Sequence, residues 1–287
     1  MKESQGPQTS LRAKRLGENL RKLRKNRKLA LRDAGDFLQR DGSTIGRYEG
    51  GEFPIRRGDL LALLSLYGVS DERTRENLLQ QCEESWRKGW WDQHVHDLGQ
   101  DFINVPWIES KANQICAYQS TVISGLLQTP TYASNIIAAE APSSEQQDQI
   151  ERWVHLRIER QKVLEGPDPA HMTMLVEEWV LNRPMGSDEA KRDQLAHLLK
   201  MGTRDNIEIR VVPSALGFHK GDTGSFSLYR MPQGYPDVAT ATSQGGTLYI
   251  EPPAIDRLYE TWDGLTSGAL SPETSTDKIS ALVERFT

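Results

Sequence analysis

The chain has 287 residues, of which 37% are hydrophobic, and it carries a formal net charge of −5. This length exceeds that of one typical domain, so we expect two domains with apolar cores. The chain has no run of about 18 apolar residues and its first ten residues lack an apolar signal core, which argues against a membrane span and predicts a cytoplasmic protein.

Two cysteines, Cys82 and Cys116, are too few for a disulfide framework or a cysteine metal site, and we expect both to be buried as small apolar residues.

Charge is distributed unevenly along the chain. Residues 1–57 hold 15 Lys and Arg against 7 Asp and Glu, a balance of +8, whereas residues 58–287 hold 20 against 33, a balance of −13. A basic head on an acidic body is typical of a DNA-binding domain joined to an effector domain.

Residues 1–10 are polar and are expected to form a disordered tail. A first helix is predicted over residues 11–25, where Leu16, Leu20 and Leu23 recur at helical spacing. Basic residues surround these leucines, and such a run is usually a solvated helix face. Because it directly precedes the two-helix unit described next, we expect part of it to lie along a DNA backbone, namely Arg21, Lys25 and Lys28.

Two short helices joined by a tight turn are predicted at residues 31–38 and 42–49 from the spacing of their apolar residues. Asp41 precedes the second helix as an N-cap, since its carboxylate can accept from the free amides of Ser43 or Thr44. Two glycines at residues 50–51 end that helix, because glycine reaches the left-handed conformation that a helix C-terminus often needs.

The outward face of the second helix carries small or polar groups at its start and one long cation a turn later, at Gly42, Ser43, Thr44 and Arg47. This profile is typical of a helix that enters the DNA major groove by its N-terminal end. A generic helical hairpin, in which the apolar spacing reflects only core packing, is the alternative. The basic flanking residues and the motif described next favour DNA binding.

The run from Ser43 to Gly51, S-T-I-G-R-Y-E-G-G, resembles the S-T-I-S-R-I-E-R-G pattern of lambda-repressor-like regulators of the xenobiotic-response-element (Cro-type) family. The resemblance implies base contacts at Gly42, Ser43 and Arg47 and a phosphate contact at Thr44. Two residues depart from the family pattern. Gln39 replaces the turn glycine, so a left-handed residue would cost about 1 kcal/mol there. Leu31 replaces a polar residue that often opens the first helix, which removes one expected phosphate contact.

Beyond the two-helix unit, Arg56 or Arg57 could contact a phosphate past the recognition helix. Helices predicted at residues 59–67 and 72–87 complete a five-helix, lambda-repressor-like domain over residues 11–85, followed by a connector over residues 86–100. The connector contains Trp86, Trp90 and Trp91, which need shelter; packing against the second domain is the main expectation, and a ligand cage is the alternative. His94, His96 and Asp97 lack a spaced partner motif, so no metal is expected.

Residues 101–287 are predicted to form an effector domain of mixed helices and strands. The whole chain is then an α+β protein, with an all-α head followed by a mixed α/β effector domain. Strands are predicted at residues 114–119, 172–181, 207–212, 225–231 and 238–250. Helices are predicted at residues 103–112, 143–164, 187–201, 253–266 and 272–286. A further helix is entered through the turn that begins at residue 123, and this helix ends at residue 139.

The second domain resembles the effector domain called DUF5753, an antitoxin-like domain that follows a lambda-repressor-like head in many actinobacterial regulators. The match rests on the run G-L-L-Q-T-P-T-Y-A at residues 125–133, on R-x-x-R-Q at residues 157–161, and on the glycine-rich residues 217–226. The resemblance implies a transcriptional regulator that is often encoded beside a small partner protein. It implies no known ligand.

We find no catalytic motif, P-loop or dinucleotide-binding glycine pattern, so we expect no enzyme, no catalytic residues and no cofactor. Hairpin or loop geometry explains the glycines around His219, although this residue could anchor a ligand in a pocket, as could Trp90 and Trp91. Glu177 and Glu178 on one strand would point to opposite faces and make poor acid–base partners. Surface ion pairing is the main expectation for Arg157 and Arg160, and binding of a partner is the alternative.

The sequence therefore predicts a sequence-specific DNA-binding transcriptional regulator that binds double-stranded DNA as a homodimer, since such heads usually read two half-sites. The helix predicted over residues 143–164 is one candidate for the dimer surface. The alternative places the main activity in residues 90–287, as a sensor of a small-molecule effector or as an antitoxin-like protein that binds a small partner protein. An enzyme with a DNA-binding head is the third hypothesis.

Overall fold

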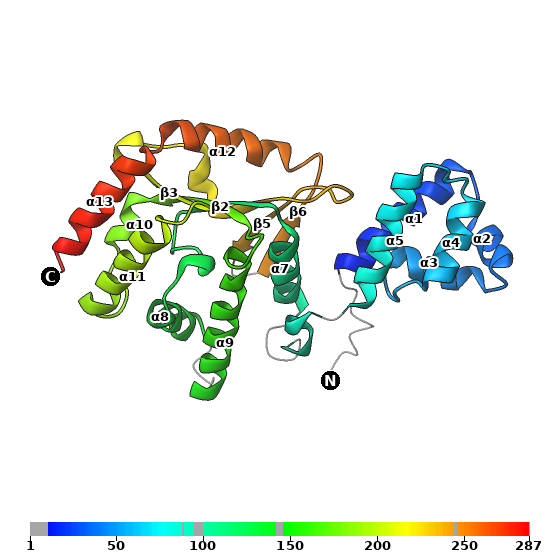
Figure 1. Cartoon of the computed structure of the whole chain (residues 1–287), viewed down its shortest axis with the longest axis horizontal. Coiled ribbons are helices and arrows are strands. Elements are labelled where there is room, and N and C mark those ends of the chain that lie inside the picture. The colour runs from blue at the N-terminus through cyan, green and yellow to red at the C-terminus, as the bar shows by residue number, and fades with distance from the viewer. Residues whose placement is uncertain (1–10, 88, 95–99, 142–145, 244–245, 287) are drawn as a thin grey trace. The chain divides into compact units, whose positions relative to one another are not determined.

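The computed structural model describes residues 11–87, 89–94, 100–141, 146–243 and 246–286. The tail expected at residues 1–10 lies outside the described residues. The chain divides into two compact units, Met1–Val95 and His96–Thr287 (Figure 1). Among the described residues, no helix has both the length and the apolar composition that a membrane crossing needs.

The first unit contains the five predicted helices followed by a short 3-10 helix. Its core is built from leucines at helical spacing, such as Leu16 and Leu20 of the first helix and Leu60, Leu63 and Leu64 of the fourth, each at most 2% exposed. Burial of these apolar faces against one another is the main source of the unit's stability. The elements are α1 (Leu11–Asn26), α2 (Leu31–Phe37), α3 (Gly42–Gly50), α4 (Arg57–Leu66), α5 (Glu72–Trp86) and η1 (Trp90–His94).

The second unit is built on a six-stranded mixed sheet in the order β3-β2-β1-β4-β5-β6. The first three strands are parallel, and β4, β5 and β6 continue the sheet antiparallel from β1. The chain is therefore α+β, as predicted. The strands are β1 (Gln114–Gln119), β2 (His171–Glu177), β3 (Ile207–Val212), β4 (Phe226–Arg230), β5 (Val238–Ser243) and β6 (Gly246–Ile250).

Helices cover the sheet from both sides (Figure 1). One face packs against α12 (Asp256–Gly268), and the buried Cys116, Leu175 and Leu228 share a core with Trp262 of that helix. The helices on the other side are α7 (Gln100–Lys111), α8 (Pro130–Glu140), α9 (Gln147–Arg160) and α11 (Asp188–Met201).

The outer edge of β3 is closed by α13 (Pro272–Glu284) and by the segment that leads into it. The backbone amide of Val211 donates to Ser275 Oγ over 2.9 Å, and the amide of Leu270 donates to the Val211 carbonyl over 2.8 Å. These bonds satisfy main-chain groups of an edge strand that would otherwise need solvent or another strand.

Both cysteines are buried, as predicted, and burial raises the pKa of each thiol to about 11.

Two predicted strands differ from the structure. The strand expected over residues 172–181 ends at Glu177, and α10 (Glu178–Asn182) follows it. The Glu178 carboxylate holds this start in place, since it accepts from the Ser214 amide over 2.9 Å and pairs with Lys278. The strand expected over residues 238–250 is the antiparallel hairpin of β5 and β6, in which Gly246 adopts a φ of 115°. Such a conformation suits glycine and breaks a straight strand.

The helix predicted over residues 143–164 is α9 followed by the 3-10 helix η3 (Gln161–Leu164). Residues 143–145 lie outside the described residues. The proposal that this helix forms the dimer surface stays a prediction.

Close packing of α1 on the end of α3 gives a test of the head's architecture. A Cβ atom on Gly17 would lie 2.4 Å from the Tyr48 carbonyl oxygen and 2.6 Å from that of Glu49. We expect Gly17→Ala to lower the free energy of unfolding of the first unit by about 1–3 kcal/mol through overpacking. The matched variant Gly58→Ala, in α4 with no atom within 4 Å of the added Cβ, should stabilise it by about 0.5–1 kcal/mol. Calorimetry of the full chain measures both, and equal effects of the two variants would contradict this packing.

Candidate nucleic-acid interface

The start of α3 is fixed by the predicted cap. The Asp41 carboxylate accepts a hydrogen bond from the Ser43 backbone amide over 2.7 Å. Hydrogen bonding to the Ser43 side chain, followed by the bond to its backbone amide, lowers the pKa of Asp41 below its ordinary value. At the other end, Gly51 adopts a φ of 71° and closes the helix by donating to the Arg47 and Tyr48 carbonyls. Both local predictions for this helix are confirmed.

The turn between α2 and α3 contains a left-handed residue that is not glycine. Gln39 has a φ of 55°, which costs about 1 kcal/mol relative to glycine. A Cβ atom on Gly35 would lie 2.8 Å from both the Arg40 carbonyl oxygen and the Gly42 amide nitrogen. The small residue at position 35 therefore lets the two helices cross at short distance, and the geometry of the helix-turn-helix is kept despite Gln39.

A buried ion pair joins α3 to α1. Arg24 Nε lies 2.6 Å from Glu49 Oε1 and Arg24 Nη2 lies 2.8 Å from Glu49 Oε2, a two-bond arrangement between side chains that are both at most 9% exposed. The third guanidinium nitrogen donates to the Leu29 carbonyl over 2.6 Å. The hydrogen bond to Glu49 is the main cause that raises the pKa of Arg24. Arg24 thus holds α1, α3 and the connection between α1 and α2 together.

A second polar contact joins α3 to α4. The Tyr48 hydroxyl donates to Asp59 Oδ2 over 2.9 Å, and Arg40 Nη2 lies 3.0 Å from the same oxygen. Burial, followed by the hydrogen bond to Asp59, raises the pKa of Tyr48. Because α3 is held by α1 along one flank and by α4 along another, only one stripe of it reaches solvent.

That stripe contains the predicted base-contacting residues. Ser43 and Arg47 are exposed and Gly42 is half-buried, whereas Ile45 and Glu49 on the opposite side are buried. The Arg47 guanidinium carbon lies 5.8 Å from the centre of the Phe53 ring. Within the part of the chain that the structure describes, Arg47 forms no ion pair, so its charge is available to a ligand.

The predicted phosphate-contacting residues differ in their surroundings. Thr44 is half-buried, and Arg57 is already paired with Glu83, with 2.5 Å between Arg57 Nη1 and Glu83 Oε1. Four cations are exposed and have no ion-pair partner among the described residues: Arg21, Lys25, Lys28 and Arg56. Contact of any of these with DNA stays a prediction.

The three residues predicted for a ligand pocket belong to different units. Trp90 and Trp91 lie in η1 of the first unit, with ring centres 5.7 Å apart in an edge-to-face arrangement. His219 lies in the second unit, where its Nε2 is 3.1 Å from Glu177 Oε1. None of the three lines the pocket described next.

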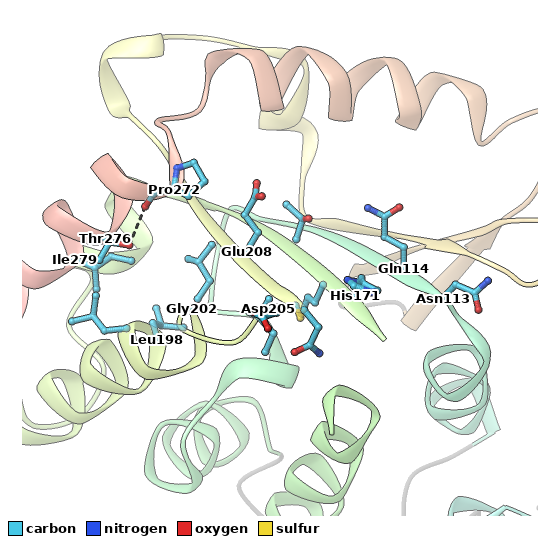
Figure 2. A pocket seen from close by; sticks show the side chains of 16 residues that line it. Asn113, Gln114, His171, Leu198, Gly202, Asp205, Glu208, Pro272, Thr276 and Ile279 are labelled. Atoms are coloured by element: carbon cyan, nitrogen blue, oxygen red, sulfur yellow. Dashed lines mark hydrogen bonds between the residues drawn. The ribbon is translucent and has the colours of Figure 1, made fainter. Parts of the chain in front are cut away.

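A pocket of about 650 Å³ opens at the N-terminal ends of β1, β2 and β3, between α11 and α13 (Figure 2). Its apolar wall includes Leu198 and Ile279, and polar groups such as His171, Asp205 and Glu208 lie around it. Ligands of parallel sheets usually bind at the opposite, carboxyl ends of the strands.

Among the described residues, no group of three or more His, Cys, Asp or Glu could hold a metal; His96 and Asp97 lie outside those residues.

Sequence reasoning missed a buried polar cluster in the second unit. The sequence indicated only that Glu177 and Glu178 make poor acid–base partners for each other. In the structure, Glu177 Oε1 accepts from the Tyr118 hydroxyl over 2.9 Å and also lies beside His219. Burial is the main cause that raises the pKa of Tyr118 far above its ordinary value, with the bond to Glu177 second. The three residues lie far apart in the sequence, so no local signal could have indicated the cluster.

Surface ion pairing, predicted for Arg157 and Arg160, is wrong. Arg160 Nη2 pairs with the buried Glu109 over 2.7 Å, and Arg157 Nη1 donates to the buried Gln128 over 3.1 Å. Burial, with repulsion from Arg160, lowers the pKa of Arg157 to about 10. Arg157 and Gln161 of the R-x-x-R-Q motif therefore hold the end of α9 to the G-L-L-Q-T-P segment, since Gln161 also donates to the Gly125 and Gln128 carbonyls. Arg160 holds α9 to α7.

A five-helix head with a capped α3 and one exposed stripe defines a helix-turn-helix protein of the DNA-binding class, joined to a mixed α/β domain. A family model for a helix-turn-helix domain matches residues 15–77, and a model described as "Domain of unknown function (DUF5753)" matches residues 102–281. The second match covers more than half of the chain, so the chain belongs to the DUF5753 family. No curated protein and no solved structure matches it. Both resemblances drawn from the sequence are confirmed.

The buried Arg24–Glu49 pair generates a stability prediction. Removal of one partner leaves the other charge buried and uncompensated, so Glu49→Ala should destabilise the first unit by about 3–5 kcal/mol. Replacement of both partners by apolar residues, in Arg24→Met with Glu49→Leu, should restore much of this loss, because no buried charge remains. Urea unfolding of the full chain measures both, and a double variant no more stable than the single one would count against the proposed cause.

Proposed function

We propose that this protein is a sequence-specific transcriptional regulator that reads double-stranded DNA with α3. The observation that carries the proposal is the exposed stripe of Ser43 and Arg47, on a helix whose start is capped by Asp41 and whose end is held by Glu49. The Arg47 guanidinium has the geometry to donate two hydrogen bonds to guanine O6 and N7 in the major groove. This site suits recognition, so we propose a binding role and no enzymatic one, in the cytoplasm.

The charge distribution supports the proposal. The balance of +8 over residues 1–57 favours association with a polyanion, and the balance of −13 over the rest disfavours contact of the second unit with DNA. Arg21 and Lys25, four residues apart on α1, are exposed on the same helix face and are suited to phosphate contacts. Phosphate contacts add affinity that does not depend on sequence, while the α3 stripe supplies sequence discrimination.

We further propose that the regulator acts as a homodimer, because helix-turn-helix heads usually bind two half-sites about one helical turn, about 34–36 Å, apart. The second unit would then supply dimerisation or signal sensing. The pocket at the N-terminal ends of β1, β2 and β3 favours the sensing role, since about 650 Å³ falls in the range of small-molecule sites, about 300–1,000 Å³. Binding of a small partner protein is the competing role of this unit.

Removal of the Arg47 side chain tests the base-reading role. Duplexes selected from a random pool by the full chain provide the operator, and fluorescence anisotropy measures the dissociation constant. Arg47→Ala should cost about 1–3 kcal/mol of binding free energy and relax discrimination at one base pair. Arg192→Ala, a partly exposed arginine of the second unit, serves as the matched control and should leave binding unchanged. Unchanged affinity and specificity of Arg47→Ala would refute the assignment.

Salt dependence tests the phosphate-contacting role of Arg56. Arg56→Ala removes one phosphate contact, so the slope of log K against log salt concentration should become about 0.9 less steep. The affinity for selected and for random duplexes should fall by the same factor. Arg57→Ala should change the slope less, because Glu83 already neutralises that guanidinium. Titration at four or five salt concentrations yields both slopes. An unchanged slope for Arg56→Ala would remove this residue from the interface.

A further inference from the structure

The exposed stripe of α3 is poor in side chains. Residues 42, 43, 46, 47 and 50 fall on one face of a helix with 3.6 residues per turn. Three of these five positions are glycine, so the helix itself offers only Ser43 and Arg47 to a ligand. A smooth central region remains on the stripe around Gly46.

The side chain of Leu31 lies beside this smooth region. Leu31 is the first residue of α2, and its Cδ1 would be 3.7 Å from a Cβ atom built on Gly46, at ordinary van der Waals distance. Its carbonyl carbon would be 3.2 Å from a Cβ atom on Gly42, so its backbone adjoins the start of the stripe as well. Leu31 is nevertheless 37% exposed. An apolar group therefore projects at the side of the stripe, next to the positions that α3 leaves empty.

The chemistry of the major groove limits what this isobutyl group can contact favourably. Phosphates and base-edge donors and acceptors would each lose water beside it without gaining a hydrogen bond. The 5-methyl group of thymine is the one methyl group, and the most projecting apolar group, on the major-groove edges of the four bases. Apolar surface of Leu31 that remains exposed in the free protein can be removed from water against that methyl group.

We propose that Leu31 is a specificity-determining residue that contacts the 5-methyl group of a thymine in the operator, close to the base read by Arg47. The reading surface is then composite: α3 supplies Ser43 and Arg47, and α2 supplies an apolar contact over Gly46. This inference rests on the proposed function and adds to it a base preference that α3 alone does not provide.

Replacement of thymine by uracil removes the methyl group and nothing else, and so tests the contact directly. Each thymine of the selected operator is replaced in turn by deoxyuridine, and the dissociation constant of the full chain is measured. At one thymine per half-site the wild-type protein should bind about three- to fivefold more weakly, the effect of one methyl group. Leu31→Ala should bind the thymine and uracil duplexes equally, and Leu31→Met, which keeps an apolar side chain, should retain the difference.

Phe37→Ala is the matched control, because Phe37 is 51% exposed at the far end of α2 and on a different face of that helix. It should retain the full uracil penalty. The inference is overturned if no thymine shows a penalty or if Leu31→Ala keeps the wild-type pattern. Failure of the proposed function has a different signature, in which the wild-type protein selects no duplex or Arg47→Ala binds the operator like wild type.

Discussion

The orientation of α3 depends on the buried ion pair between Arg24 and Glu49. Both carboxylate oxygens of Glu49 accept from one guanidinium, whose remaining nitrogen donates to the Leu29 carbonyl. A buried pair of this kind contributes little net stability compared with apolar residues of the same shape, but its geometry is restrictive. Together with the contact of Tyr48 to Asp59, it allows one rotation of α3 about its axis, and that rotation exposes Ser43 and Arg47.

The two units differ in charge and in architecture. The head is basic, and its α3 is held by the buried Arg24–Glu49 pair and by the partly buried contact of Tyr48 with Asp59. The second unit is acidic and builds a mixed sheet with helices on both sides (Figure 1). Its β3 edge is closed by Ser275 and Leu270, and its pocket lies at the N-terminal ends of the parallel strands. A sensing role for that pocket would link a metabolite to the DNA-binding head.

Most of the head could be predicted from the sequence because its signals are local. The Asp41 cap, the spacing of Ile45 and Tyr48, and the terminal glycine of α3 all act within one or two helical turns. The Arg24–Glu49 pair could not be predicted, since it joins residues 25 positions apart and basic residues surround Arg24 in the sequence.

In the second unit, the elements with strong periodicity were found, whereas the helix at Glu178 was missed, because its start depends on Ser214 and Lys278. The interior pairing of Arg160 with Glu109 was missed for the same reason: a charged residue on an amphipathic helix gives no local sign of a buried partner.

Cross-linking from position 43 tests most directly whether α3 reads base edges. Cys82 and Cys116 are buried, so Ser43→Cys introduces a reactive thiol that can carry a short photoactivatable group. On the selected operator, this group should cross-link to specific bases through the major groove, whereas the same group at Glu76→Cys, on the exposed face of α5, should not. Absence of base cross-links from position 43, or equal cross-linking from both positions, would contradict the account.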